Sequence, residues 1–121
     1  MHQFSFEKLE VWQLSRKLVN KIYTITKSFP NSEKFGLSNQ IRRAVLSVSS
    51  NLAEGTSRKS SKDQAHFSQI AFSSLMEVAN QIILANDLKY INETQLSELR
   101  EEINELSNKI NALYNYQKNR K

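Results

Sequence analysis

Residues 40–58 read QIRRAVLSVSSNLAEGTSR, and apolar and polar side chains alternate in this stretch with the period of an α-helix. Ile41, Val45, Val48 and Leu52 recur every three or four residues, which places them on one helical face. The other flank carries guanidinium, hydroxyl, amide and carboxylate groups at the same spacing. That flank fits three alternatives: a polar seam between helices, a ligand or nucleic-acid surface, or ordinary solvated surface.

Three further segments have the same period, and short breaks separate them. Pro30 and Gly36 interrupt the chain before the opening stretch, Gly55 is a plausible C-terminal cap for it, and Ser60 or Ser61 can cap the helix that follows. Asn92 and Gln95 have the spacing of a capping box. The expected helices span about 6–26, 37–54, 62–89 and 93–116.

The last of these segments carries an unbroken heptad pattern. Its apolar residues alternate three- and four-residue steps: Leu96, Leu99, Ile103, Leu106, Ile110 and Leu113. Four helices joined by short links predict one all-α domain over residues 1–121, an antiparallel up-down-up-down four-helix bundle. The basic residues after position 116 are expected to fray.

Composition narrows the class of protein. Two glycines and one proline in 121 residues argue against a turn-rich β fold, and no cysteine is present. No signal peptide or membrane-spanning run is apparent, so we expect a cytoplasmic protein.

Catalytic signatures are missing from the sequence. His2 and His66 are the two histidines, and no glutamate has a histidine three residues later, as a di-iron bundle requires. The serines have no evident His/Asp partners, and no glycine-rich phosphate loop occurs. We expect no enzyme activity, no cofactor and no metal site.

The net charge of +5 suits a polyanionic partner. Five cations fall between positions 42 and 62, and they are the candidate nucleic-acid contacts: Arg42, Arg43, Arg58, Lys59 and Lys62. The first two and the last three should form separate patches, about 20 Å apart by helical rise. A solvated surface, or an internal ion pair of Arg43, is the alternative.

The polar flank suggests an architectural role. Asn51, Glu54, Glu77 and Gln81 lie among apolar residues at helical spacing. Buried amides and carboxylates persist when they are paired. We therefore hypothesise an interhelical network that joins these four residues to Arg43 or Arg58 and fixes register or subunit geometry.

Several motifs together resemble a known family. They are Leu9-x-Val11-Trp12, Phe29-Pro30-x-x-Glu33-x-Phe35-Gly36-Leu37, Gln40-Ile41-Arg42-Arg43-Ala44 and Ser50-Asn51-Leu52-Ala53-Glu54-Gly55. The chain resembles the four-helix-bundle proteins encoded by intervening sequences of bacterial 23S rRNA genes, also labelled as ribosomal proteins. The family often has proline where Ser49 stands and glycine where Lys89 stands.

The resemblance implies a bundle that assembles as a ring-shaped homopentamer with a basic face and has no established enzymatic activity. A related branch accompanies the reverse transcriptases of diversity-generating retroelements. The leading hypothesis is therefore a non-enzymatic oligomer that binds nucleic acid, most simply structured RNA. The competing hypothesis is a protein-interaction adaptor, for example for a reverse transcriptase, that uses the heptad of the fourth helix or the surface of the ring.

Overall fold

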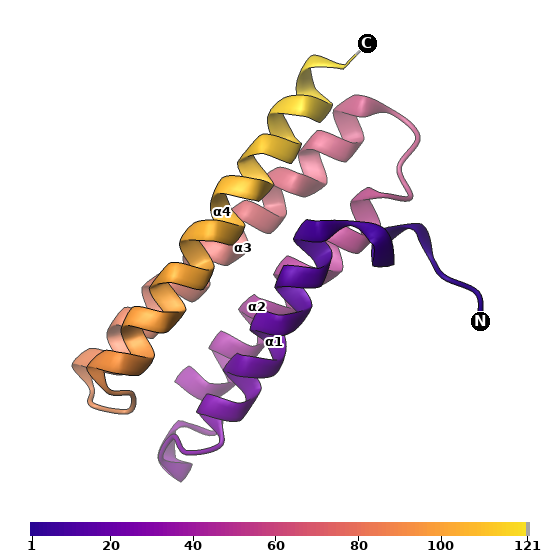
Figure 1. The fold of residues 1–121 in the computed structure, drawn as a ribbon. Coiled ribbons are helices and arrows are strands. Elements are labelled where there is room, and N and C mark those ends of the chain that lie inside the picture. Colours follow the sequence, from indigo (N-terminus) through magenta and orange to yellow (C-terminus); the bar gives the residue numbers. More distant parts are fainter. Residues whose placement is uncertain (121) are drawn as a thin grey trace.

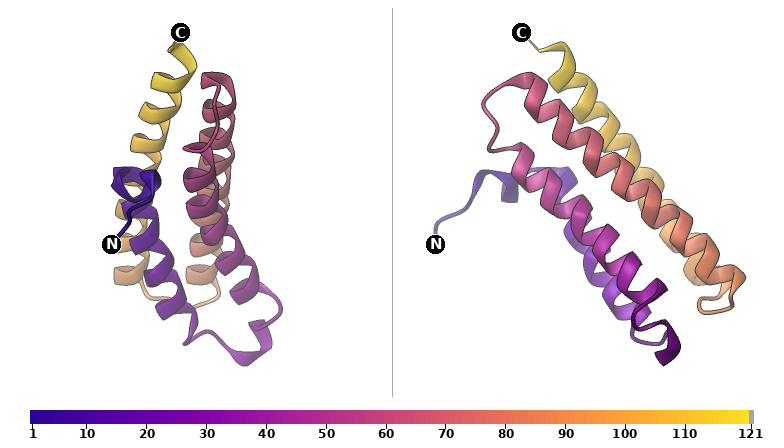
Figure 2. Two further views of the ribbon diagram at one scale, coloured as in Figure 1. Left: turned by 90° about the vertical axis from the view of Figure 1, so that its right-hand side faces the viewer. Right: turned by 180° about the vertical axis from the view of Figure 1, so that it is seen from behind.

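The computed structural model describes residues 1–120, and it confirms the predicted all-α bundle. Successive helices run in opposite directions and pack side by side (Figure 1, Figure 2). No strand occurs among the described residues. The elements are η1 Ser5–Lys8, α1 Glu10–Thr26, η2 Asn31–Glu33, α2 Leu37–Gly55, α3 Ser61–Asp87 and α4 Glu93–Asn119, where η denotes a 3₁₀ turn.

The first predicted helix is interrupted near its start. Leu9 has an extended backbone, with φ −82° and ψ 120°, and it separates η1 from α1. The Glu7 carboxylate accepts a hydrogen bond from the Phe4 N–H at 2.7 Å, which closes η1 as a separate turn. The chain before α1 consequently turns toward the end of α2 instead of extending the helix.

Gly55 has a different role from the one expected. It is the last residue of α2 and its φ is not positive, so it is not a left-handed cap. A Cβ atom at this position would lie 3.1 Å from the Cβ of Phe67. The absence of a side chain therefore lets α2 and α3 approach closely.

All four helices contribute to the core; α3 packs on both α2 and α4, while α1 packs mainly on α2 and touches α4 little. Ion pairs cross the α1–α4 seam: Lys21 to Glu102 at 2.6 Å, and Lys109 to Glu10 at 3.1 Å. The hydrogen bond to Glu102 raises the pKa of Lys21. Because these side chains are partly exposed, each pair adds at most about 1 kcal/mol.

The heptad of α4 faces inward. Leu99, Ile103, Leu106 and Ile110 are buried in the protein's own core. The expectation that this heptad is a docking surface for a partner is therefore wrong, because the same seam closes the bundle on α3. A heptad pattern in one chain does not reveal whether the partner helix is its own or another molecule's.

The α1–α2 and α3–α4 connections meet at one end of the bundle. The Glu33 carboxylate accepts hydrogen bonds from the Leu37 N–H at 3.0 Å, at the start of α2, and from the Tyr90 hydroxyl at 2.9 Å. Beside them the rings of Phe29 and Tyr90 lie 5.3 Å apart. The hydrogen bond from the Leu37 N–H lowers the pKa of Glu33 most, and the bond from the Tyr90 hydroxyl lowers it further. The same hydrogen bond between Tyr90 and Glu33 raises the pKa of Tyr90.

Lys89 adopts a left-handed conformation with φ 65°. The Lys89 N–H donates to the Asn86 carbonyl and the Tyr90 N–H donates to the Ala85 carbonyl, which completes a Schellman motif at the end of α3. Glycine suits this position because it lacks the Cβ that strains a left-handed residue. At Ser49, the other departure from the resemblance, α2 continues without interruption.

At the opposite end α3 and α4 extend beyond the other two helices (Figure 1, Figure 2). Lys109 pairs with Glu10 at the start of α1, yet α4 continues to Asn119. Gly55, the last residue of α2, lies against Phe67 of α3. The turns of α3 before Phe67, which begin at Ser61, therefore extend beyond the end of α2. The bundle therefore ends in a projecting two-helix tip, here defined as residues 56–67 and 113–120.

Replacing Glu33 with glutamine should weaken the bundle in a pH-dependent way. A carboxyl whose folded pKa is lowered adds stability above its unfolded pKa, near 4.5, and loses that contribution as pH falls through the folded value. The difference in unfolding free energy between wild type and Glu33→Gln should thus shrink with acidification below about pH 4.5. Urea titrations at several pH values measure this difference in unfolding free energy, with Glu93→Gln as the control. A difference between wild type and Glu33→Gln that stays the same at every pH would contradict the role of the ionised Glu33 carboxylate.

Candidate nucleic-acid interface

Arg42 is held by the end of α1. Its Nε donates to the Thr26 hydroxyl at 2.7 Å, and its guanidinium lies 4.7 Å from the centre of the Tyr23 ring. One amino group also reaches the Tyr23 carbonyl at 3.5 Å, in the last turn of α1. These contacts make Arg42 a bridge between α1 and α2, whereas Arg43 is exposed and forms no ion pair among the described residues.

The other three predicted cations lie together on the projecting tip. The Arg58 guanidinium binds Glu54 at 2.9 Å and lies 4.5 Å from the centre of the Phe67 ring. Lys59 and Lys62 are exposed, and neither forms an ion pair within residues 1–120. The structure thus keeps these three residues apart from Arg42 and Arg43, as two patches.

The end of α4 joins this tip, which the sequence analysis missed. Instead of fraying, α4 continues to Asn119, and Arg120 donates to the Ser61 hydroxyl at 3.1 Å and to the Gln64 amide at 2.5 Å. Ser68 and Gln117 form a buried hydrogen bond of 2.6 Å just below. Gln117 lies four residues after Leu113 and continues the heptad spacing, a signal that could have extended the helix.

Aromatic rings accompany the cations of the tip. Besides the Arg58–Phe67 pair, Lys118 lies 5.8 Å from the centre of the Tyr114 ring, and Arg120 lies 5.7 Å from that of Tyr116. Tyr116 is 63% exposed. Scattered in sequence, these residues form a mixed aromatic and basic surface, the composition that binds phosphates and stacks unpaired bases.

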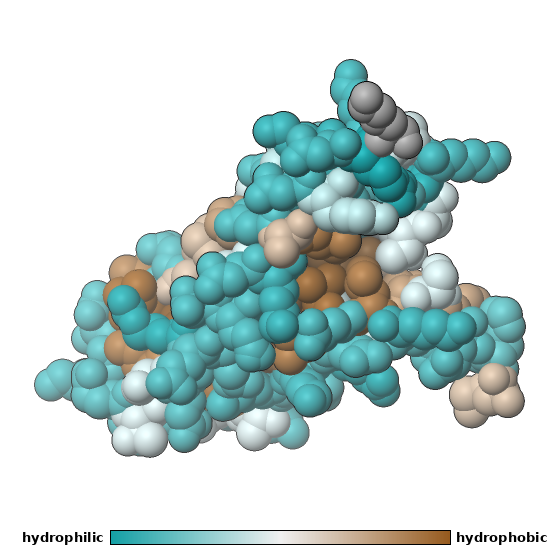
Figure 3. Space-filling view, turned by 45° about the horizontal axis from the view of Figure 1, so that its top comes forward, coloured by the Kyte–Doolittle hydropathy of each residue, from teal (hydrophilic) through white to brown (hydrophobic). Residues whose placement is uncertain are grey.

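Charge is unevenly distributed along the bundle. Residues 54–64 and 113–120 contain five cations and two carboxylates: Arg58, Lys59, Lys62, Lys118, Arg120, Glu54 and Asp63. Residues 93–105 of α4 contain five glutamates and one arginine. In Figure 3 the surface around the C-terminal end of α4 is mainly hydrophilic, and apolar side chains are visible in a recess beside it. A polyanion is therefore attracted to the tip and repelled by the first half of α4.

The predicted interhelical network divides into separate pairs. Asn51 donates to the Ser47 carbonyl and hydroxyl at 2.8 and 3.0 Å, and Ser47 contacts Ser74 of α3 at 2.9 Å. Glu54 does not join them, because its exposed carboxylate binds Arg58 one turn later. The polar link between α2 and α3 thus joins Ser47 to Ser74, with Asn51 bound to Ser47 within α2, and Glu54 takes no part in it.

The remaining two residues of the network form a pair within α3. The Gln81 amide donates to Glu77 at 3.2 Å, and the Gln81 Oε1 is buried without a hydrogen-bond partner among the described residues. Arg43 contacts none of the network residues in the hydrogen bonds of the described chain.

An open groove runs between the outer faces of α3 and α4. Its α3 wall is apolar, with Met76 39% and Ile83 38% exposed, while its α4 wall presents the amides of Asn104, Asn108 and Asn111. Arg100 and Glu101, which also line it, balance in charge. A groove without net charge suits a protein segment better than a phosphate backbone.

The described residues contain neither a metal-binding cluster nor a membrane-spanning helix. Residues 1–120 contain no group of three histidine, cysteine, aspartate or glutamate side chains placed to hold a metal ion. None of the helices in that range combines the length and hydropathy needed to cross a bilayer.

Fold and charge together define a small all-α bundle with a cationic, aromatic tip. A protein-family model described as 23S rRNA-intervening sequence protein matches residues 7–112. The chain therefore belongs to the 23S rRNA-intervening sequence protein family.

Comparison with solved structures supports the same fold. A protein with unknown function from the S23 ribosomal protein family of Bacteroides thetaiotaomicron VPI-5482 superposes with a TM-score of 0.80 and is 23% identical. The match covers 87% of this chain and 95% of that one. No curated protein matches the chain. At this identity the likeness establishes the fold, and function has to be argued from the surface.

The two adjacent arginines should respond differently to substitution. Arg42→Ala removes a charged hydrogen bond and a cation–π contact to α1, so it should lower the unfolding free energy by about 1–2 kcal/mol. Arg43→Ala, the matched control, should change it by less than about 0.5 kcal/mol. Thermal or urea unfolding measures both, and equal effects would show that Arg42 is not a structural bridge.

Proposed function

We propose that this chain is a non-enzymatic, oligomeric, cytoplasmic protein that binds nucleic acid, most simply structured RNA, through the projecting tip. The observation that carries the proposal is the gathering of five cations from the α2–α3 loop, α3 and α4 next to three aromatic rings. Family membership supports it, because the family is described by its location in 23S rRNA genes.

The contacts of the tip divide the cations by role. Arg58 and Arg120 are fixed by Glu54, Ser61 and Gln64, so they can present their remaining donors in a defined geometry. Lys59 and Lys62 are exposed and supply long-range attraction to phosphate. The Arg42 guanidinium is bound to Thr26 and Tyr23 of α1, and Arg43 lies in the second patch, away from the tip. We therefore assign both arginines a smaller part in RNA binding.

Removing a tip lysine should weaken RNA binding about equally for all sequences. Lys59→Gln and Lys62→Gln should each reduce affinity for a ribosomal RNA fragment and lower the slope of log affinity against log salt by about 0.7–0.9, since each removes one phosphate contact. Fluorescence anisotropy of a dye-labelled RNA measures both quantities. Lys34→Gln, which removes the same charge at the opposite end, should leave both unchanged. Absence of wild-type binding even at low salt would end this proposal.

Self-association is the second part of the proposal. The groove between α3 and α4 exposes Met76 and Ile83 beside amides that can hydrogen-bond, and it has no net charge. We assign it to a contact with a second copy of the chain, within the ring-shaped pentamer that the resemblance implies. A ring would place several tips on one assembly and multiply weak phosphate contacts.

The mass of the native assembly tests this contact. Wild type should have a mass of five chains, and Ile83→Glu should lower it, since a buried charge at an interface is unfavourable. Leu46→Glu, on the exposed side of α2, is the matched control and should keep the wild-type mass. A wild-type monomer would contradict the proposal, and a monomer that instead co-purifies with a reverse transcriptase would favour the adaptor hypothesis.

A further inference from the structure

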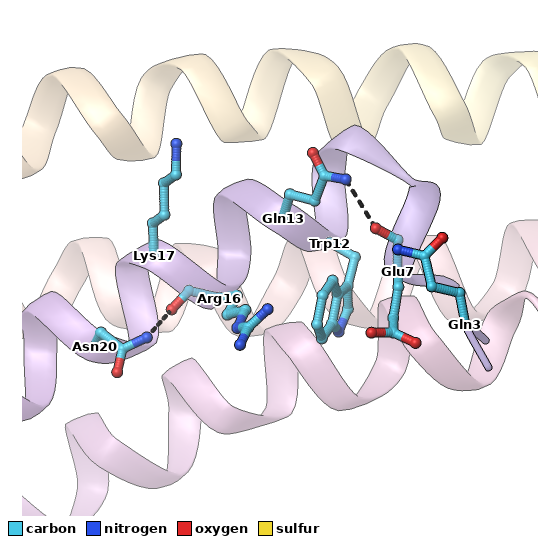
Figure 4. A pocket seen from close by; sticks show the side chains of 7 residues that line it. All are labelled: Gln3, Glu7, Trp12, Gln13, Arg16, Lys17 and Asn20. Atoms are coloured by element: carbon cyan, nitrogen blue, oxygen red, sulfur yellow. Dashed lines mark hydrogen bonds between the residues drawn. The ribbon is translucent and has the colours of Figure 1, made fainter. Parts of the chain in front are cut away.

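A second surface hollow lies between α1 and the N-terminal segment. It has a volume of about 450 Å³, within the range of small-ligand sites. Its lining comes from the N-terminal segment and from α1: Gln3, Glu7, Trp12, Gln13, Arg16, Lys17 and Asn20. Figure 4 shows the indole of Trp12 between the side chains of Arg16 and Glu7.

From this arrangement we propose that the hollow holds one unpaired nucleotide of an RNA strand, with the base on Trp12 and the phosphate on Arg16. The proposal rests on the RNA binding argued above, and adds a site and a base preference to it. Trp12 is half-buried, and the centres of its ring and of the Phe6 ring lie 5.0 Å apart with the planes at 65°, a contact that keeps the indole in place. A fixed, partly exposed aromatic ring is the usual platform for an unpaired base.

Arg16 is available for a phosphate. Its guanidinium lies 5.5 Å from the centre of the Trp12 ring and forms no ion pair among the described residues. Lys17 also lacks an ion pair there, and in Figure 4 it points away from Trp12. Arg16 is therefore the direct contact, and Lys17 adds positive potential at the rim.

Glu7 gives the hollow a preference among bases. One oxygen of its carboxylate accepts the Phe4 N–H, and the other has no hydrogen-bond partner among the described residues. A free carboxylate oxygen accepts a hydrogen bond from an exocyclic amino group, which adenine and cytosine carry and uracil lacks. Gln13, whose amide group donates to the Glu7 carbonyl at 2.8 Å, keeps the N-terminal turn on α1.

A separate recess lies next to the hollow, at the end of α2. Phe4, Ser5 and Phe6, which are neighbours in sequence of the hollow's lining residues Gln3 and Glu7, line this recess against Glu54 and Ser57. Glu54 in turn binds Arg58 of the tip. A strand held by phosphate contacts at Arg58, Lys59 and Lys62 can therefore continue across the N-terminal turn and place one base at Trp12.

Trp12 is the only tryptophan in the chain, so its emission reports this one position. The experiment titrates the full chain with an RNA hairpin that has an unpaired adenine loop, and follows Trp12 emission and the anisotropy of a dye on the RNA. We expect the RNA to quench Trp12 emission, with the quenching and the anisotropy reaching saturation at the same RNA concentration. A uracil loop of equal length should quench Trp12 emission less. Arg16→Gln should raise the midpoint of quenching roughly threefold to tenfold. Lys27→Gln, which removes the same charge at the far end of α1, should not change it.

The outcomes separate the two proposals. RNA binding by anisotropy with unchanged Trp12 emission would overturn the nucleotide site and leave the tip intact. Loss of quenching in Lys59→Gln but not in Arg16→Gln would also overturn it. Quenching by adenosine monophosphate at lower concentration than by the hairpin would show a site for free nucleotides and refute the RNA assignment. No binding by anisotropy would instead refute the proposed function on which the site rests.

Discussion

The Glu33 carboxylate connects parts of the bundle that are far apart in sequence. It accepts the first free N–H of α2 and the hydroxyl of Tyr90, which follows α3 by three residues. One side chain therefore fixes the start of α2 and ties it to the α3–α4 turn. Gly36 makes this possible, because a Cβ there would lie 2.6 Å from the Glu33 Oε1. One carboxylate and the space it occupies thus account for Glu33, Gly36 and Leu37 in the motif from Phe29 to Leu37.

Because one end is closed in this way, the two ends of the bundle differ. The closed end carries buried Phe29, the Schellman turn at Lys89 and the acidic first half of α4. At the other end α3 and α4 project alone, and polar contacts such as Arg120 to Ser61 hold them. Most side chains of this tip are exposed, so they can reach a partner. Hydrogen bonds between the two connections thus hold the closed end, while the projecting end brings together cations from separate parts of the chain.

The sequence predicted the fold well and the site only in part. Periodic apolar residues, the Asn92–Gln95 capping box and the Ser60 cap located α2, α3 and α4 to within a few residues. The break at Leu9 was missed, since a 3₁₀ turn keeps nearly helical spacing. The inward direction of the α4 heptad and the separation of Glu54 from Asn51 depend on which helix covers which face. Local pattern contains no information on that tertiary choice.

The cationic tip illustrates the same limit and shows what the structure adds. The sequence places Arg58 and Arg120 62 residues apart, so their common surface depends on α4 returning along α3 to Ser61 and Gln64. Arg42, in contrast, looks equally basic in sequence, but Thr26 and Tyr23 occupy its guanidinium. Arg58 and Arg120 also contact their own chain, but they are exposed and keep further donors toward solvent, whereas Arg42 is half-buried between α1 and α2. Available donors, rather than positive charge alone, therefore define the surface that RNA would meet.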